Sequence, residues 1–241
     1  MLRTHMWTQM ARLEDKDMSS PQIIASSLSK ILPVSLPKAS RTAAAVLKSG
    51  HVIATPTDTI YGIAALVQNN TAVQRLYEIK GRDTLKPIAL CLAEIDQIFD
   101  WGQVTVNRSL LEELLPGPVT IIFQRKPTLN PEFNPGTDLI GIRIPDHNFV
   151  REVCRFCEGP VALTSANPSS AKSTLSVEEF QGLHAKLHSV FDGGRLSDSE
   201  EARLGSTVID LSIPGAYKII RNGSAFFRTK KVLESFELSP L

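Results

Sequence analysis

Strand-like and helix-like patterns alternate along most of this chain, and that alternation limits the folds open to it. Short apolar runs such as HVIAT (residues 51–55) and VTIIFQR (residues 119–125) have the length and composition of buried strands. Between them lie helical patterns such as NTAVQRLYEIKG (residues 70–81), with Asn70 as the expected N-cap and Gly81 at the expected end. The sequence therefore predicts an α/β domain built on one large twisted sheet.

The remaining elements follow the same alternation. We expect further helices at residues 39–50, 107–115, 147–159 and 176–191 and from about Thr229. We expect further strands at residues 87–92, 139–144, 160–164, 206–211 and 217–221. Short loops join several neighbouring strands, so the sheet should be mixed, with antiparallel as well as parallel pairs.

Three segments are expected along the chain. Residues 1–38 are interrupted by prolines and are interpreted as a flexible N-terminal leader, residues 39–228 as the folded domain and residues 229–241 as a helical tail. With 42% hydrophobic and 21% charged residues, the 241-residue chain can bury an ordinary core. Its 26 basic and 25 acidic residues disfavour a non-specific nucleic-acid binder with a strongly cationic body.

The cysteine content and the N-terminal residues indicate the cellular compartment. Three cysteines are too few for a disulfide framework and indicate a reducing compartment. No apolar stretch of the sequence reaches the roughly 18 residues of a membrane span. The first thirteen residues contain Arg3 and Arg12 but no acid, as in transit peptides, whereas Glu14, Asp15 and Asp17 are atypical of one. We therefore expect the cytoplasm, with the mitochondrion as a second location.

Three cations, Lys80, Arg82 and Lys86, stand directly before the strand predicted at residues 87–92. Lys80 and Arg82 lie at the C-terminal end of a predicted helix, where cations complement the helix dipole. Lys86 lies beyond that helix, and Pro87 holds its backbone extended. Dipole complementation therefore does not explain Lys86, and three cations around one loop suit a phosphate chain.

Polar residues also gather where other predicted strands begin or end. The loop PTDTIYG (residues 56–62) reads equally well as a polar turn or as a ligand loop. The stretch LTSANPSSAKS (residues 163–173) offers hydroxyl and amide groups that suit an anion. The candidate residues at these strand ends are Thr59, Ser165, Asn167, Ser173, Ser206 and Arg221.

One arginine interrupts an apolar strand. In LIGIRI (residues 139–144), alternation places Gly141 and Arg143 on the face opposite the three isoleucines. An arginine in such a run needs an anionic partner or solvent. An exposed sheet face and a bound carboxylate are both open at this point, and the glycine leaves room for a ligand.

Several familiar catalytic patterns are missing from the sequence. It contains no GxxxxGK[ST] loop, GxGxxG motif, nucleophile elbow or HExxH motif. Cys154 and Cys157 share a helical face with two valines, which favours buried packing over a redox pair. His184 and His188 lack a third ligand nearby, so no metal site is predicted. The candidate chemistry rests on hydroxyls and cations, which is typical of positioning anionic substrates.

Seven stretches in a fixed order carry a family resemblance. PTDTIYG, KGR, KPIALCL, LLPGPVT, GIRIPDH, LTSAN and GSTVID, the last followed by IIRNG, together resemble the YrdC-like threonylcarbamoyl-AMP synthases. The family's K-x-R … S-x-N signature stands here as Lys80-Gly-Arg82 and Ser165-Ala-Asn167. The resemblance implies a single YrdC-like domain whose large mixed sheet, flanked by helices, forms a concave basic groove.

The resemblance also implies an enzyme. It would be a nucleotidyltransferase that forms L-threonylcarbamoyladenylate and pyrophosphate from L-threonine, bicarbonate or CO2, and ATP, with Mg²⁺ expected on the phosphates. A threonylcarbamoyl-transferase complex would then make N6-threonylcarbamoyladenosine at position 37 of tRNA, and direct contact with tRNA or double-stranded RNA stays open. The alternative is a non-catalytic RNA-binding module that uses the basic groove, although 6% aromatic residues offer little stacking on bases.

The resemblance assigns roles residue by residue. The implied catalytic residues are Lys80, Arg82, Ser165 and Asn167. The implied ATP-binding residues are Lys80, Arg82, Lys86, Ser165, Asn167, Ser173 and Arg221. The implied threonine-binding residues are Thr59, Arg143 and Ser206. Cys91 stands where some relatives have a histidine near threonine, so that role and simple packing are both open for it.

Overall fold

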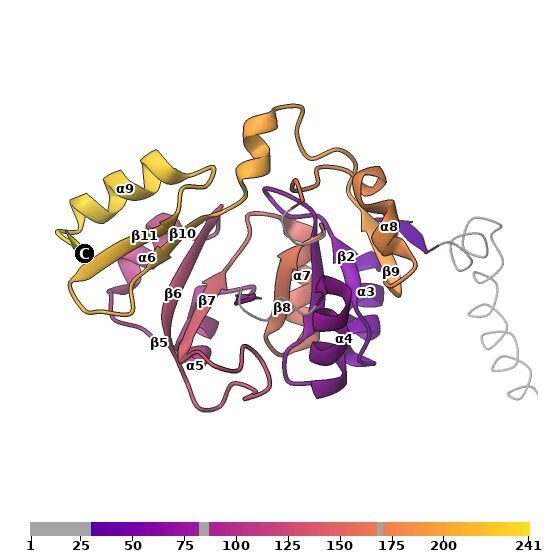
Figure 1. Cartoon of the computed structure of the whole chain (residues 1–241), viewed down its shortest axis with the longest axis horizontal. Helices are drawn as coiled ribbons and strands as arrows, with labels where there is room; N and C mark the ends of the chain where they lie inside the picture. Colours follow the sequence, from indigo (N-terminus) through magenta and orange to yellow (C-terminus); the bar gives the residue numbers. More distant parts are fainter. Residues whose placement is uncertain (1–29, 82–86, 168–170) are drawn as a thin grey trace, which may run out of the picture.

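The computed structural model describes residues 30–81, 87–167 and 171–241. One 12-stranded sheet runs through this part of the chain, with helices on both of its faces (Figure 1). The strand order is β1-β9-β2-β3-β8-β4-β7-β6-β10-β11-β12, and β5 pairs with β6. The α/β architecture predicted from the alternating patterns is therefore confirmed.

The elements have the following bounds. The strands are β1 (Ile31–Pro33), β2 (Ile53–Thr55), β3 (Gly62–Leu66), β4 (Ala89–Cys91), β5 (Gly102–Gln103), β6 (Val119–Arg125), β7 (Leu139–Arg143), β8 (Val161–Ser165), β9 (Ser189–Asp192), β10 (Thr207–Asp210), β11 (Ala216–Arg221) and β12 (Ser239–Pro240). The α-helices are α3 (Ala39–Lys48), α4 (Asn70–Lys80), α5 (Ile98–Trp101), α6 (Arg108–Leu114), α7 (Asn148–Cys157), α8 (Gln181–His184) and α9 (Phe226–Ser235). The 3-10 helices are η1 (Ile95–Gln97), η2 (Val177–Phe180) and η3 (Glu200–Leu204).

The sheet is mixed, as the short loops predicted. Parallel pairs are β1/β9, β2/β9, β4/β7, β6/β10 and β11/β12. Antiparallel pairs are β2/β3, β3/β8, β4/β8, β5/β6, β6/β7 and β10/β11. The central strands β3, β8, β4, β7, β6 and β10 thus come from distant parts of the sequence and meet side by side.

Alternation along the strands builds two apolar cores. In β3, Ile63 and Ala65 pack into the core that also receives Leu76 of α4, whereas Ala64 enters the core that receives Val153 of α7. Helices α3 and α7 pack against each other over that second core. A strand with both faces buried reads as a continuous apolar run, which is why GIAAL lacks a polar alternation.

Helix α4 ends as predicted but begins one residue away from the expected cap. Gly81 adopts the left-handed conformation with φ 74°, which a residue with a Cβ rarely adopts, and it ends the helix. The N-cap is Asn69 rather than Asn70, because the Asn69 side chain accepts a hydrogen bond from the amide of Ala72 at 3.0 Å. This places Lys80 in the last turn of α4.

The prediction of a helix at residues 176–191 is wrong over the second half of that range. The chain forms η2 and the short helix α8 and then enters β9 (Ser189–Asp192). Strand β9 pairs in parallel with both β1 and β2, so Val190 and Phe191 are fully buried between neighbours. Tertiary pairing overrides local helix propensity here. His188 therefore follows α8 instead of sharing one helix with His184.

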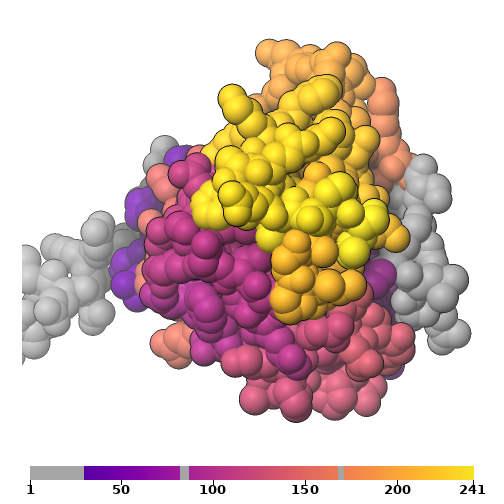
Figure 2. Space-filling model, turned by 90° about the vertical axis from the view of Figure 1, so that its left-hand side faces the viewer, coloured from indigo at the N-terminus to yellow at the C-terminus, as the bar shows by residue number. Residues whose placement is uncertain are grey.

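Both ends of the described chain join the fold. Strand β1 pairs with β9, so the leader predicted for residues 1–38 extends too far, and residues 1–29 lie outside the described residues. Helix α9 begins at Phe226, before the predicted boundary at residue 229, and its Thr229 and Leu233 are fully buried. Figure 2 shows this yellow segment packed on the magenta segment that includes α6, where Arg228 donates to the carbonyl of Glu113 at 2.6 Å.

Candidate functional site

A cavity of about 360 Å³ lies against the central strands. Residues of β3, β6, β7, β8, β10 and β11 line it together with the loop before β3 and the entrance to β4. Four of the predicted site residues are in its lining: Arg143, Ser165, Ser206 and Arg221. None of the described lining residues is acidic. The cavity therefore presents hydroxyls and cations, which suits an anionic ligand.

Arg143 lies at the end of β7 with only 7% of its surface exposed. Its Nη2 donates to the Oγ1 of Thr59 at 2.8 Å and to the carboxylate of Asp58. Its Nε is buried and has no hydrogen-bond partner among the described residues. The expected anionic partner is thus Asp58, and the unpartnered Nε–H leaves a donor for a further acceptor.

The loop before β3 is both a structured turn and part of the cavity wall. The hydroxyl of Thr57 accepts hydrogen bonds from the amides of Thr59 and Ile60 at 3.1 and 3.3 Å and donates to the carbonyl of Ile60 at 2.7 Å. Thr57 lines the cavity, whereas Thr59 lies behind it, next to Arg143. Turn chemistry therefore fixes the position of the Thr59 hydroxyl.

Ser206 stands at the entrance to β10 within a cluster of polar groups. Its hydroxyl lies 2.8 Å from the Oγ1 of Thr120, and Arg221 donates to it at 3.0 Å and to the Ser206 carbonyl at 2.8 Å. Burial, and to a lesser degree the nearby charge of Arg143, lower the pKa of Arg221. Two arginines thus line one cavity, from β7 and β11, with β6 and β10 between these strands.

The two halves of the K-x-R … S-x-N signature meet in space. The Nζ of Lys80 donates to the carbonyls of Ser165 and Asn167 at 2.9 and 2.7 Å. The side-chain amide of Asn167 donates to the carbonyl of Ala171 at 2.5 Å, and its Oδ1 is buried without a partner among the described residues. Lys80 therefore ties the end of α4 to the end of β8, a role beyond helix-dipole complementation.

Two of the predicted cations lie outside the described residues. These are Arg82 and Lys86, for which the roles expected in ATP binding stay predictions. The basic character of the groove stays a prediction for the same reason, because these two residues were to supply much of it.

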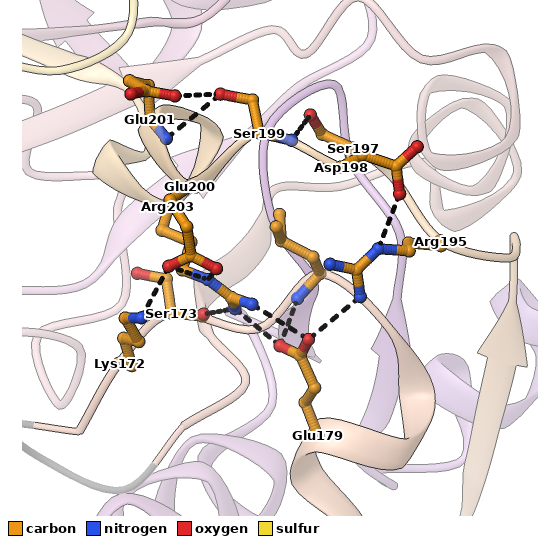
Figure 3. Close-up of polar contacts among 11 residues, drawn as sticks. Lys172, Ser173, Glu179, Arg195, Ser197, Asp198, Ser199, Glu200, Glu201 and Arg203 are labelled. Carbon is orange, nitrogen blue, oxygen red and sulfur yellow. Dashed lines mark hydrogen bonds and ion pairs between the residues drawn. The ribbon is translucent and has the colours of Figure 1, made fainter.

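Ser173 lies at the edge of an ion-pair network that Figure 3 shows in full. Arg203 donates to the Ser173 carbonyl at 2.6 Å, to both carboxylate oxygens of Glu179 at 2.6 and 3.0 Å, and to Glu200 at 3.0 Å. Lys172 pairs at 2.5 Å with the Oε2 of Glu200, which Arg203 also contacts. The hydrogen bonds from Arg203 lower the pKa of Glu179 to about 2. The network fixes the main chain around Ser173, although that residue is not in the cavity lining.

The cysteines pack rather than react. Cys91 is not in the cavity lining, and its Sγ lies 3.6 Å from the Sγ of Cys154 under helix α7. Burial raises the pKa of Cys157 to about 12, and a hydrogen bond with Cys91 together with burial raises that of Cys154. The packing interpretation of Cys154 and Cys157 is confirmed, and packing is also what the structure gives Cys91.

Sequence reasoning left some functional groups unassigned. Asp58 was visible as a carboxylate inside PTDTIYG, but its pairing with Arg143 spans 85 positions and has no local signal. Thr120 lies inside an apolar strand, and Arg203 lies in the charged 3-10 helix η3, so neither stands out in the sequence. Within the described ranges, no group of three or more His, Cys, Asp or Glu residues is arranged to hold a metal ion.

Comparison with known proteins gives consistent matches. A family model for the Sua5, YciO and YrdC proteins, described as "Telomere recombination", matches residues 45–223. The threonylcarbamoyl-AMP synthase of Rattus norvegicus is 50% identical over 199 residues, which cover 82% of this chain and 71% of the rat protein. The human enzyme of the same name is 48% identical over the same shares.

Solved structures with the same fold extend the comparison. The crystal structure of Pyrococcus abyssi Sua5 complexed with L-threonine matches with a TM-score of 0.76 and 27% identity. The match covers 88% of this chain but 62% of that one, so this chain spans less than two thirds of its length. Escherichia coli YciO matches with a TM-score of 0.69 at 20% identity, which shows a common fold.

Proposed function

Because this chain belongs to the Sua5, YciO and YrdC family, we propose that it is a threonylcarbamoyl-AMP synthase. It converts L-threonine, bicarbonate or CO2, and ATP into L-threonylcarbamoyladenylate and pyrophosphate. Its relatives of that name, at up to 50% identity, support this function and do not favour the alternative of a non-catalytic RNA-binding module. The reaction class is nucleotidyl transfer.

The observation that carries this proposal is the environment of the Arg143 side chain. A buried guanidinium with one unpartnered N–H beside a cavity suits a carboxylate, which accepts charge-assisted hydrogen bonds from arginine. L-Threonine supplies such a carboxylate, and its hydroxyl and amine find donors and acceptors near Thr59 and Ser206. The crystallised P. abyssi Sua5 is in complex with L-threonine, which agrees with this assignment.

The other side of the cavity suits the nucleotide. Lys80 holds the carbonyls of Ser165 and Asn167, so the end of β8 keeps one geometry while the Oδ1 of Asn167 stays available as an acceptor. We assign ATP to this side, with Arg82, Lys86 and Ser173 as proposed contacts. We propose that Arg221, which contacts Ser206, lies between the two substrates.

The chemistry has two steps. The threonine amine attacks the carbon of CO2 and forms a C–N bond, and the ammonium group gives up two protons to leave a carbamate. With bicarbonate as the source, the C–OH bond breaks and the hydroxide leaves as water with one of these two protons. A carbamate oxygen then attacks the α-phosphorus of ATP, the bond from that phosphorus to the bridging oxygen breaks, and pyrophosphate leaves. Positioning and charge stabilisation account for such a transfer, so no strong general base is needed.

Mg²⁺ is expected to accompany the phosphates of ATP. The described lining of the cavity has no carboxylate, and Asp58 is engaged by Arg143, so the protein offers the ion few ligands of its own. The ion would supply charge neutralisation on the phosphates. The residues that orient the reactants are those of the chain itself.

The product is an activated threonylcarbamoyl group that needs an acceptor. We propose a threonylcarbamoyl-transferase complex acting on tRNA as the next partner, and direct contact of this chain with tRNA stays a prediction. No helix in residues 30–81, 87–167 and 171–241 is long and apolar enough to cross a membrane. The cytoplasm and the mitochondrion stay the predicted locations.

One assay tests the activity directly. The purified chain is incubated with ATP, L-threonine and labelled bicarbonate, and the labelled adenylate and pyrophosphate are measured. We expect both products to depend on threonine, and Arg143→Lys to weaken threonine binding about 10- to 100-fold while ATP binding is retained, because an ammonium lacks the planar fork. A folded protein that releases no threonine-dependent pyrophosphate would refute the assignment.

A further inference from the structure

A second cavity, of about 730 Å³, shares no lining residue with the first. The two residues before β2, one face of α4, Lys30 and the segment between α8 and β9 form its walls. Val52, Ile79 and Leu187 give it an apolar part. Its charged and imidazole side chains are Lys30, His51, Arg75, Glu78, Lys186 and His188. Its size is that of a small-molecule site, and no step of the proposed reaction uses it.

The fixed charges around this cavity are unbalanced. Three cations, Lys30, Arg75 and Lys186, face one carboxylate, Glu78. Lys30 donates to two main-chain carbonyls, and Arg75 donates to the carbonyl of Gly50 at 2.6 Å. In the described part of the chain, none of these three cations forms an ion pair with a carboxylate. The network around Arg203 is the opposite case, because each of its cations has an acidic partner (Figure 3).

Two stacked imidazoles add a titratable component. The rings of His51 and His188 lie with their centroids 4.5 Å apart. Arg75 lies 3.1 Å from the Nδ1 of His51, and because arginine can only donate, that nitrogen is the acceptor and the ring proton is on Nε2. Burial, followed by the charges of His51 and Lys30, lowers the pKa of His188. An anion bound beside this ring would compensate these charges and favour the protonated form of His188.

We propose that this second cavity binds a phosphate group, carried either by a small phosphorylated molecule or by an RNA backbone. A phosphate presents up to two negative charges and several acceptor oxygens, which matches three cations and two imidazole N–H groups better than a single carboxylate does. The apolar wall accommodates the carbon skeleton attached to the phosphate. The site stands independently of the proposed synthase activity, and binding of an anion there favours protonation of His188.

Histidine signals offer a direct measurement, because the chain has only five histidines. Imidazole resonances are followed by NMR while pyrophosphate, or in a second arm a short RNA hairpin, is titrated into the full chain. We expect the His51 and His188 resonances to shift together and the apparent affinity to rise about threefold between roughly pH 7.5 and 6.0. Shifts with pyrophosphate alone identify a small-ligand site, and stronger binding of the hairpin identifies an RNA site.

Matched variants separate this site from the first cavity. Lys186→Glu reverses an exposed charge beside the histidine pair and should weaken the binding about tenfold without changing threonine-dependent pyrophosphate release. Lys231→Glu makes the same charge change on α9 and should leave the binding unchanged. The proposal is overturned if neither probe shifts His51 and His188, or if Lys186→Glu binds as tightly as Lys231→Glu. Loss of synthase activity in the unmodified chain would leave this result unaffected.

Discussion

Asp58 and Arg143 form an ion pair that is almost completely buried, with 9% and 8% of their side chains exposed. One oxygen of Asp58 accepts from the guanidinium, and the other accepts from the amide of Asp146 at 3.1 Å. The carboxylate is therefore anchored to the main chain, and it holds one end of Arg143 while the Nε–H stays available. Asp58 therefore orients the guanidinium of Arg143 at the cavity.

Removal of Asp58 should destabilise the fold as well as the site. Asp58→Ala leaves the Arg143 charge buried without compensation, and we expect the free energy of unfolding to fall by about 3–5 kcal/mol. Urea unfolding followed by circular dichroism measures this change. Asp100→Ala removes an exposed carboxylate and should change the same quantity by less than about 0.5 kcal/mol. Equal stabilities of the two variants would contradict the buried pair.

A matched pair of variants tests whether Lys80 does more than complement the dipole of its helix. Lys80 and Lys48 are each the basic residue in the last turn of a helix, α4 and α3. Lys80→Ala also releases the carbonyls of Ser165 and Asn167, so we expect threonine-dependent pyrophosphate release to fall about 10²–10³-fold. Lys48→Ala should retain normal activity. A similarly small loss of pyrophosphate release in both variants would show that the contacts of Lys80 with β8 are unimportant for activity.

Gly223 is the glycine whose replacement should damage the site most directly. A Cβ at this position would lie 2.2 Å from the carbonyl carbon of Ser206 and 2.3 Å from the amide of Thr207. Because those atoms belong to the backbone of the strand entrance, Gly223→Ala must displace Ser206. We expect a loss of stability of at least about 1–3 kcal/mol and weaker threonine binding by calorimetry.

The control for Gly223 is another glycine with open space around it. A Cβ added at Gly182 in α8 would have no heavy atom within 4 Å apart from those of its chain neighbours and its own helix backbone. Gly182→Ala should leave threonine binding intact and stabilise the chain slightly, by up to about 1 kcal/mol, since alanine favours a helix. A fully active Gly223→Ala protein would show that the close approach to Ser206 is unimportant.

The Arg203–Glu179 contact predicts a specific dependence of stability on pH. The folded chain holds the pKa of Glu179 at about 2, below the ordinary 4.5. A lowered carboxyl pKa contributes stability that is complete above the unfolded value and disappears as the pH falls through the folded value. The melting temperatures of the unmodified chain and Glu179→Gln should therefore differ most above about pH 5 and converge towards pH 2.

A charge-matched control again sharpens the comparison. Glu113→Gln removes an exposed carboxylate on α6 without touching the network around Arg203. Its melting temperature should follow that of the unmodified chain at every pH. If the Glu179→Gln difference persisted unchanged down to about pH 2, the ion pair would not be its cause.

Local patterns predicted much of the architecture because they act within a few residues. Strand β6 has the predicted bounds, 119–125, and Arg143 faces the cavity because alternation from Ile142 requires it. Gly81 ends α4 because few other residues adopt its conformation. The short strands β1, β5 and β12 were not predicted, since pairing with distant neighbours defines them and their two or three residues carry no periodicity.

The kinds of residue in the site could be predicted from the sequence, whereas the contacts between them could be predicted less well. Hydroxyls and cations at strand ends indicated an anionic ligand, and four of them line one cavity. Lys80 contacts the main chain of β8 instead of projecting freely, and Arg221 contacts Ser206, because strand order brings these segments together. No spacing in the sequence encodes that Asp58 and Arg143 are partners, since the contact depends on the folded sheet.

The place of β10 in the sheet affects how the protein folds during its synthesis on the ribosome. Ser206 reaches Thr120 only when β10 lies in parallel beside β6, and 86 residues separate the two side chains in sequence. Translation delivers the walls that contain Thr57, Arg143 and Ser165 first, so a nascent chain stalled before residue 206 has a cavity that is open on one side. A ligand can stabilise the complete cavity by binding only after β10 and then β11, which supplies Arg221, have emerged and docked.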